Sequence, residues 1–325
     1  MQESLFEGGA ATSERVPKPV DISCAPDAAL EAVVRHILKP GRRALESRFA
    51  RIFRASIDEI LDGRRTMRFD FGKVSSVEKS YLGAKVEILA RNEFGFGYGS
   101  TLDYLINGHE VDAKFSATGE WMIAPRNVGQ LLLLMKAAEG SSVFSVGVVR
   151  AESSLLRPGT TRDSKRSFHA LGKASIRWLV EDAPYPQNQL MELYRKDQQA
   201  VRAVFSSSKS GQKRVDELFR RLQSVHVNRT TIQTVAAQED SSKRVRDSRI
   251  ALQKEGILIL GYHHRHRIIA EALGMNPISQ GEWVAVRVHP AEAGNVSPQA
   301  IVNGASYRLA AEGDQPTPAP AIPNE

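Results

Sequence analysis

The chain has 325 residues, 42% hydrophobic and 25% charged, a composition typical of a soluble globular protein with about two domains. Its longest apolar run, Leu131–Met135, is far shorter than the ~20 residues that cross a bilayer, and the N-terminus lacks the pattern of a signal peptide. Cys24 is the single cysteine, which excludes an intrachain disulfide and predicts a reducing, cytoplasmic location.

The net charge of +7 is concentrated in one segment of the chain. Residues 207–270 contain 13 Lys and Arg against 6 Asp and Glu, a balance of +7, so the remaining residues sum to about zero. Because nucleic-acid-binding surfaces are basic, this distribution favours a DNA or RNA partner for the second half of the chain.

The first half begins with a leader and continues into helical patterns. Residues 1–26 have no periodicity, and we predict a disordered leader. Apolar residues then recur at spacings of three and four from Asp27 to Leu61, which predicts a helix ended by Asp62-Gly63. The segment Lys79–Glu93 predicts a second helix.

The segment Leu102–Phe115 is the most informative part of the chain. Asn107-Gly108 predicts a two-residue hairpin turn, which would place Asp103 directly opposite Asp112, with Cβ atoms roughly 5 Å apart. Lys114 lies two residues along the same strand and therefore on the same face as Asp112. Two carboxylates and a lysine suit a magnesium site for phosphodiester hydrolysis, with Glu87 of the preceding helix as a further ligand or proton acceptor. A solvated surface hairpin has the same pattern, and the residues alone leave both interpretations open.

The rest of the first half predicts an apolar stretch at Val128–Ala138, a buried strand at Val143–Val149 and a helix at Ala170–Val180. Pro184 and Pro186 interrupt the chain. We therefore expect a first domain at residues 27–182, a linker at 183–189, a second domain at 190–308 and a disordered Pro-rich tail at 309–325.

The second domain predicts three helices, at Lys213–Ser224, Thr230–Ala237 and Ser241–Arg249. A short strand, Ile257–Leu260, and a basic loop, Gly261–Arg267, follow. This order favours a winged helix-turn-helix whose third helix enters the major groove of DNA, although a basic scaffold helix would have the same composition. The candidate DNA-binding residues are the cations of this region: Lys213, Arg214, Arg229, Lys243, Arg244, Arg246, Arg249, Arg265 and Arg267.

Longer motifs carry a family resemblance from about Ile57 to Val288. They include DGRRT at residues 62–66, EKSYLGAKVEI at 78–88, GHEVDAKFS at 108–116, WMIAP at 121–125 and EWVAVRV at 282–288. With these motifs the chain resembles the NaeI restriction endonuclease family, a branch of the PD-(D/E)xK nucleases. The residues that match the catalytic set of the family are Glu87, Asp103, Asp112 and Lys114.

The resemblance implies an α/β (α+β) restriction-endonuclease-like nuclease core with a C-terminal winged helix-turn-helix domain. It implies a homodimeric type II enzyme, IIE-like, that hydrolyses double-stranded DNA with Mg²⁺ held by Asp103, Asp112 and Glu87. It also implies that both domains bind DNA, so that a second DNA copy acts as an effector. Two alternatives stay open: a DNA-binding regulator with an inactive nuclease fold, and a nicking nuclease of repair or recombination.

Overall fold

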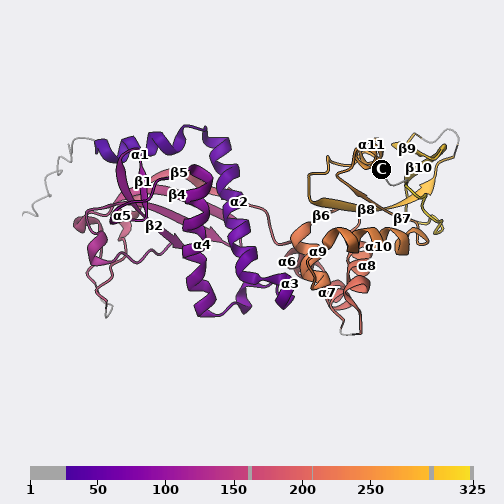
Figure 1. Ribbon diagram of the computed structural model, residues 1–325, viewed down its shortest axis with the longest axis horizontal. Coiled ribbons are helices and arrows are strands. Elements are labelled where there is room, and N and C mark those ends of the chain that lie inside the picture. The colour runs from indigo at the N-terminus through magenta and orange to yellow at the C-terminus, as the bar shows by residue number, and fades with distance from the viewer. Residues whose placement is uncertain (1–26, 160–162, 207, 293–295, 323–325) are drawn as a thin grey trace, which may run out of the picture.

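The computed structural model describes residues 27–159, 163–206, 208–292 and 296–322, which form two units joined by a short linker (Figure 1). The predicted leader at 1–26 lies outside the described residues. The first unit contains α1 (Ala28–Leu38), α2 (Arg42–Leu61), α3 (Gly63–Thr66), η1 (Phe71–Lys73), α4 (Ser76–Phe94), β1 (Tyr104–Ile106), β2 (His109–Ser116), η2 (Pro125–Asn127), β3 (Leu131–Ala138), β4 (Val143–Arg150), η3 (Ser153–Leu155), α5 (Ala170–Ala174) and β5 (Arg177–Pro184). The second contains α6 (Gln189–Lys196), α7 (Gln198–Val204), α8 (Gly211–Arg221), β6 (His226–Asn228), α9 (Arg229–Ala236), α10 (Ser241–Gln253), β7 (Ile257–Gly261), α11 (His264–Ala272), β8 (Glu282–Pro290), β9 (Gln299–Val302) and β10 (Ala305–Leu309).

A five-stranded mixed sheet in the order β1-β2-β3-β4-β5 forms the centre of the first unit. Strands β2 and β3 are parallel, and the other neighbours are antiparallel. The apolar stretch around Leu131–Met135 is the central strand β3, where Leu131 and Leu133 face one core and Leu132 and Leu134 face another. A strand covered on both faces needs apolar residues at every position, which explains the continuous run.

Helices α1, α2 and α4 cover one face of this sheet (Figure 1). The prediction of one helix from 27 to 61 is wrong, because the chain breaks at Pro40-Gly41 and Gly41 has a φ of 87°. The predicted stop at Asp62 is confirmed, since Asp62 adopts the left-handed conformation at the C-cap of α2. The predicted helix at 79–93 is confirmed as α4, which starts three residues earlier because Ser75 and Glu78 form a capping box.

The predicted helix at 170–180 is wrong beyond residue 174. Helix α5 ends at Ala174, and the following residues form β5, which pairs with β4, the strand predicted at 143–149. Pairing along β4 buries Leu179 and Val180, and this tertiary gain overrides the local helical pattern. Strand β5 runs to Pro184, so it extends into the segment that the sequence predicts as linker.

The second unit combines helices with a second sheet in the order β6-β8-β10-β9, and β7 pairs with the other edge of β8. Ile257 and Ile259 of β7 face the core formed with α6 to α10, whereas Leu258 and Leu260 face the core formed with α11. The three predicted helices appear as α8, α9 and α10. The predicted basic loop at 261–267 is wrong in its second half, because His264 starts α11 and the helix buries Ile269 and Ala270.

The two units meet where α3 lies against α9 (Figure 1). Gly63 approaches α9 so closely that a Cβ at this position would overlap the Thr234 hydroxyl. Phe69 crosses from the first unit and stacks on Phe205, with ring centroids 5.5 Å apart. Arg64 forms an ion pair with Glu239. These contacts come from one short segment of the first unit.

The end of the chain differs from the predicted disordered tail. Ala319 is only 3% exposed within the core formed with α11, and its backbone exchanges hydrogen bonds with Gln253 at the end of α10. The small and apolar residues between the prolines therefore provide a buried contact that composition alone does not reveal. Across the residues that the structure describes, no helix is long and apolar enough to cross a membrane.

The mixed α/β fold that the sequence predicts is confirmed.

Candidate active site

The predicted hairpin is present with the predicted register. Tyr104 pairs with Val111, Leu105 with Glu110 and Ile106 with His109. Asn107 and Gly108 have φ values of 50° and 82°, which is typical of the turn that matches the right-handed twist of the strands. The register places Asp103 at the open end of the hairpin, next to Asp112 and Ala113 of β2.

Asp103 is tied to the backbone of β2. Its Oδ2 accepts a hydrogen bond of 2.7 Å from the amide of Ala113, the residue after Asp112. The backbone pairing between β1 and β2 begins at Tyr104. Beyond it, the amide of Ala113 bonds to the side chain of Asp103 instead of to a backbone carbonyl oxygen. Asp103 therefore has a structural contact that the opposed-carboxylate interpretation did not include.

Asp112 is 3% exposed, and this burial raises the pKa of its carboxyl. Lys114 forms an ion pair with Asp112 Oδ2 and opposes the rise, whereas the nearby Asp103 adds to it. The three residues predicted on one face of the hairpin are thus brought together. Lys114 provides the positive charge that compensates Asp112.

Glu87 of α4 approaches the same two aspartates. Burial raises the pKa of Glu87, and the charge of Asp103 raises it further. Arg91, one turn along α4, opposes this shift and donates to Glu87 Oε1 at 2.8 Å and to the carbonyl oxygen of Asp103 at 3.2 Å. The guanidinium of Arg91 also lies 4.4 Å from the ring centroid of Tyr98.

Sequence reasoning missed both Arg91 and Asn127. The spacing of four residues on one helix could have indicated the pairing of Arg91 with Glu87. Asn127 Nδ2 donates to Asp112 Oδ2 at 2.9 Å, in a buried contact between residues 15 positions apart. Asn127 is the last residue of η2, which precedes β3, and no periodic signal in the sequence points to this contact.

The predicted metal set is only partly assembled. Within the described ranges, no group of three or more His, Cys, Asp and Glu side chains is arranged to hold a metal ion. Glu87 is ion-paired with Arg91. Asp103 and Asp112 nevertheless fit Mg²⁺, which commonly uses one or two carboxylates and takes its other ligands from water and phosphate oxygens.

The chain is similar to known restriction endonucleases. The family model described as restriction endonuclease NaeI matches residues 32–318. The chain is also 37% identical over 289 residues to the type II restriction enzyme NaeI of Lentzea aerocolonigenes, covering 86% of the chain and 90% of the relative. The chain belongs to the NaeI restriction endonuclease family. The predicted family is confirmed, and so is the prediction of a type II restriction enzyme.

In this member of the NaeI family, the cations predicted to bind DNA fall into two groups. Three of them are half-buried: Arg214, Arg244 and Arg249. Arg214 donates to the carbonyl oxygens of Lys209, Val235 and Ala236, so its hydrogen bonds hold the end of α9. The exposed group comprises Lys213, Arg229, Lys243, Arg246, Arg265 and Arg267.

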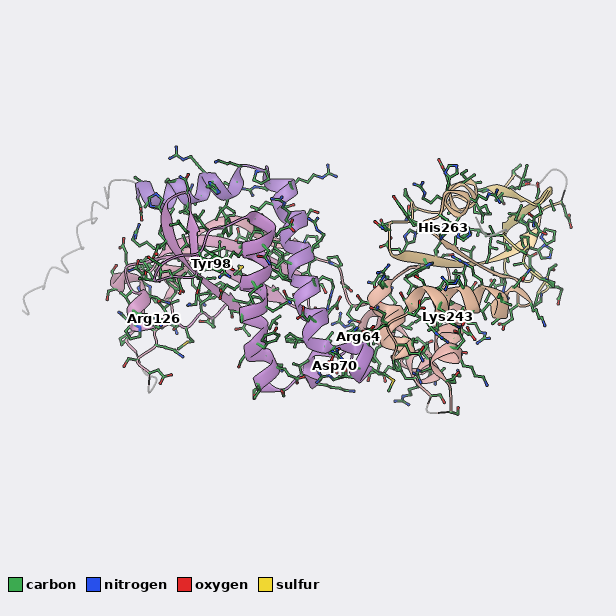
Figure 2. The ribbon with its side chains drawn as sticks, viewed as in Figure 1. Arg64, Asp70, Tyr98, Arg126, Lys243 and His263 are labelled. Atoms are coloured by element: carbon green, nitrogen blue, oxygen red, sulfur yellow. The ribbon has the colours of Figure 1, made fainter. Side chains whose placement is uncertain are left out.

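Four of these arginines line one hollow of about 460 Å³ in the second unit of this NaeI-family protein: Arg229, Arg246, Arg249 and Arg265. They come from α9, α10 and α11, and His263, labelled in Figure 2, lies at the same hollow. Burial lowers the pKa of Arg249 to about 10, and the neighbouring Arg246 adds to the effect. Glu282, the carboxylate at the hollow, is hydrogen-bonded to the amide of Ser279 at 3.1 Å. With four arginines against one carboxylate in its lining, the hollow is electropositive.

Proposed function

We propose that this type II restriction enzyme hydrolyses double-stranded DNA with Mg²⁺ at the site formed by Glu87, Asp103, Asp112 and Lys114. The observation that supports this proposal is the convergence of two strands and a helix on one acidic cluster, with Lys114 ion-paired inside it. The same four residues match the catalytic set implied by the family.

Asp103 and Asp112 would hold the cation, and Glu87 would join them through its free oxygen or through water. When bound, Mg²⁺ neutralises negative charge on the phosphate and lowers the pKa of coordinated water. The chain's own residues supply the other steps. Glu87 accepts a proton from the attacking water. Lys114 donates to a non-bridging phosphate oxygen as the water oxygen bonds to phosphorus and one P–O ester bond breaks. The departing ester oxygen takes a proton from solvent water.

The second unit is proposed as a winged helix-turn-helix domain, residues 190–308, that binds DNA through α9 and α10. Lys243 and Arg246 are exposed on α10, and the hollow beside Arg246 provides the positive surface for a DNA phosphate. Lys213, Arg229, Arg244, Arg265 and Arg267 complete the proposed surface. Arg214 and Arg249 are assigned a supporting role, because Arg214 donates to three backbone carbonyl oxygens and Arg249 donates to the carbonyl oxygen of Ile259.

Two further properties extend the proposal beyond the single chain. A homodimer would bring two active sites to the two strands of one target. A second DNA copy, bound by the second unit, would act as an effector for cleavage by the first. The contact of α3 with α9 provides a direct connection between the two units.

The deciding experiment is digestion of a sequence-diverse plasmid with Mg²⁺, followed by sequencing of the DNA ends. We expect linear fragments whose ends share one sequence, and no cleavage in excess EDTA. Nicked circles as the final product would favour a nicking nuclease, and sequence-specific binding without cleavage would favour a regulator. Adding a short duplex with the target sequence tests the effector, since it should increase the cleavage rate.

The matched variant for this experiment is Lys114→Ala. We expect cleavage to fall by about 10²–10³-fold, the usual effect of removing one group that stabilises transition-state charge. DNA binding, measured by fluorescence anisotropy, should change little because Lys114 acts on the reacting phosphate. Cleavage at the wild-type rate would remove Lys114 from the site.

A further inference from the structure

The side-chain amide of Asn127 is an unusual feature of the active site. Asn127 is 1% exposed, and its Nδ2 donates to Asp112 Oδ2. Its Oδ1 is buried and has no hydrogen-bond partner among the described residues. A buried polar atom without a partner weakens a fold, so the amide needs a function that an apolar side chain of the same shape would not have.

The backbone holds this amide firmly in place. Asn127 N donates to the carbonyl oxygen of Ala124 at 2.9 Å, and Asn127 O accepts from the amide of Gln130 at 3.2 Å. The following strand, β3, pairs in parallel with β2, so that Leu132 lies opposite Asp112. Asn127 lies in η2, shortly before β3, so it approaches Asp112 from the side of β2 opposite to β1.

Two donors meet at one oxygen of Asp112. Lys114 Nζ and Asn127 Nδ2 both contact Oδ2, and the Asp112 carboxyl also lies within hydrogen-bonding reach of Asp103. In the proposed reaction Lys114 turns an N–H group toward a phosphate. Asn127 has no such task, and it is the donor that stays when Lys114 moves.

We propose that Asn127 is a positioning residue, whose buried amide fixes the Asp112 carboxylate through Oδ2 so that it can bind a divalent cation. This inference rests on the proposed function, because it assumes that Asp112 is a metal ligand. Groups that hold a ligand in place typically change metal affinity 10–100-fold when they are removed. If Asn127 only connected η2 to β2, its replacement would lower the stability of the fold and leave the metal affinity unchanged.

The test compares Asn127→Leu with Asn127→Ala, and uses Gln130→Ala as the matched control. Leu has nearly the shape of Asn but cannot donate, and it also removes the unpartnered Oδ1. Gln130 is exposed, and the control keeps its backbone bond to Asn127. Binding of Mn²⁺ to the full chain without DNA is measured by electron paramagnetic resonance, together with a metal-free thermal melt.

For Asn127→Leu we expect Mn²⁺ to bind about 10–100-fold more weakly than to the wild type. The melting temperature of this variant should stay close to that of the wild type. The Mg²⁺ concentration for half-maximal cleavage should rise by a similar factor, and Gln130→Ala should behave as the wild type. Unchanged Mn²⁺ affinity in Asn127→Leu would overturn the inference, whatever happens to stability. If the wild type itself binds no Mn²⁺, the proposed metal site fails, and this outcome is separate from the first.

Discussion

Asp103 illustrates how one side chain can have both a structural and a chemical role. Its Oδ2 accepts the amide of Ala113, and its charge raises the pKa of Asp112. The sequence predicts that Asp103 lies beside Asp112, because the turn at Asn107-Gly108 determines the register. The hydrogen bond from the Ala113 amide depends on the backbone conformation just before β1, which no pattern in the sequence predicts.

The comparison of Asp103→Asn with Asp103→Ala separates these roles. Asparagine keeps an oxygen for the Ala113 amide and removes the repulsion with Asp112, so metal-free stability should stay level or rise. Alanine leaves the amide without its acceptor and should cost about 1 kcal/mol. Both variants should lose cleavage, because both remove a proposed metal ligand. The measurement is a metal-free thermal melt beside a plasmid cleavage assay. An asparagine variant as unstable as the alanine variant would show that the charge itself stabilises the hairpin.

At the scale of the element, the helices of the second unit contain arginines of two kinds. Arg214 of α8 donates to backbone carbonyl oxygens at the end of α9. Arg246 of α10 is exposed and lines the electropositive hollow. Composition counts both as positive charge, and the sequence predicts both as DNA contacts. Their environments differ: Arg214 stabilises the fold, and Arg246 is exposed where a phosphate could bind.

We therefore expect opposite effects from Arg214→Ala and Arg246→Ala. Loss of Arg214 leaves buried carbonyl oxygens without donors and should destabilise the fold by about 1–3 kcal/mol. Loss of Arg246 should leave the melting temperature nearly unchanged and weaken DNA binding. The slope of log affinity against log salt should then decrease by about 1, since one phosphate contact is lost. Lys254→Ala, an exposed cation outside the hollow, is the control. Equal salt slopes for Arg246→Ala and the wild type would exclude Arg246 as a phosphate contact.

At the scale of the whole molecule, the connection between the two units depends on a small area. Residue 63 must be small because Thr234 of α9 occupies the space beside it. Arg54 anchors the linker from within the first unit, with ion pairs to Asp58 and Glu139 and a 3.4 Å hydrogen bond to the carbonyl oxygen of Pro186. The linker and the packing of α3 on α9 therefore both connect the two units, and a change at the α3–α9 contact should affect both units.

Gly63→Ala tests this connection. The added methyl group forces α3 and α9 apart and should cost about 1–3 kcal/mol, as overpacking usually does. Proteolysis within residues 185–188 should become faster, and stimulation by an effector duplex should decrease. Gly140→Ala is the control, because nothing lies within 4 Å of a Cβ at Gly140. If both variants resist protease equally, α3 can shift without disturbing the linker.

The sequence by itself determined the features that depend on neighbours along the chain. The turn at Asn107-Gly108 sets the hairpin register, and the register brings Asp103, Asp112 and Lys114 together. The concentration of charge in residues 207–270 marks the segment that contains the electropositive hollow. Longer motifs identified the family, which the comparisons confirm.

Only the tertiary structure decided what depends on packing between distant segments. Pairing with β4 makes a strand of residues 177–184, although the local pattern favours a helix. Asn127 reaches Asp112 because β2 and β3 are parallel neighbours, and Arg214 is withdrawn from the surface because α9 ends beside it. Local propensities and side-chain periodicities extend over a few residues, whereas these contacts arise only when strands and helices far apart in the chain are brought together.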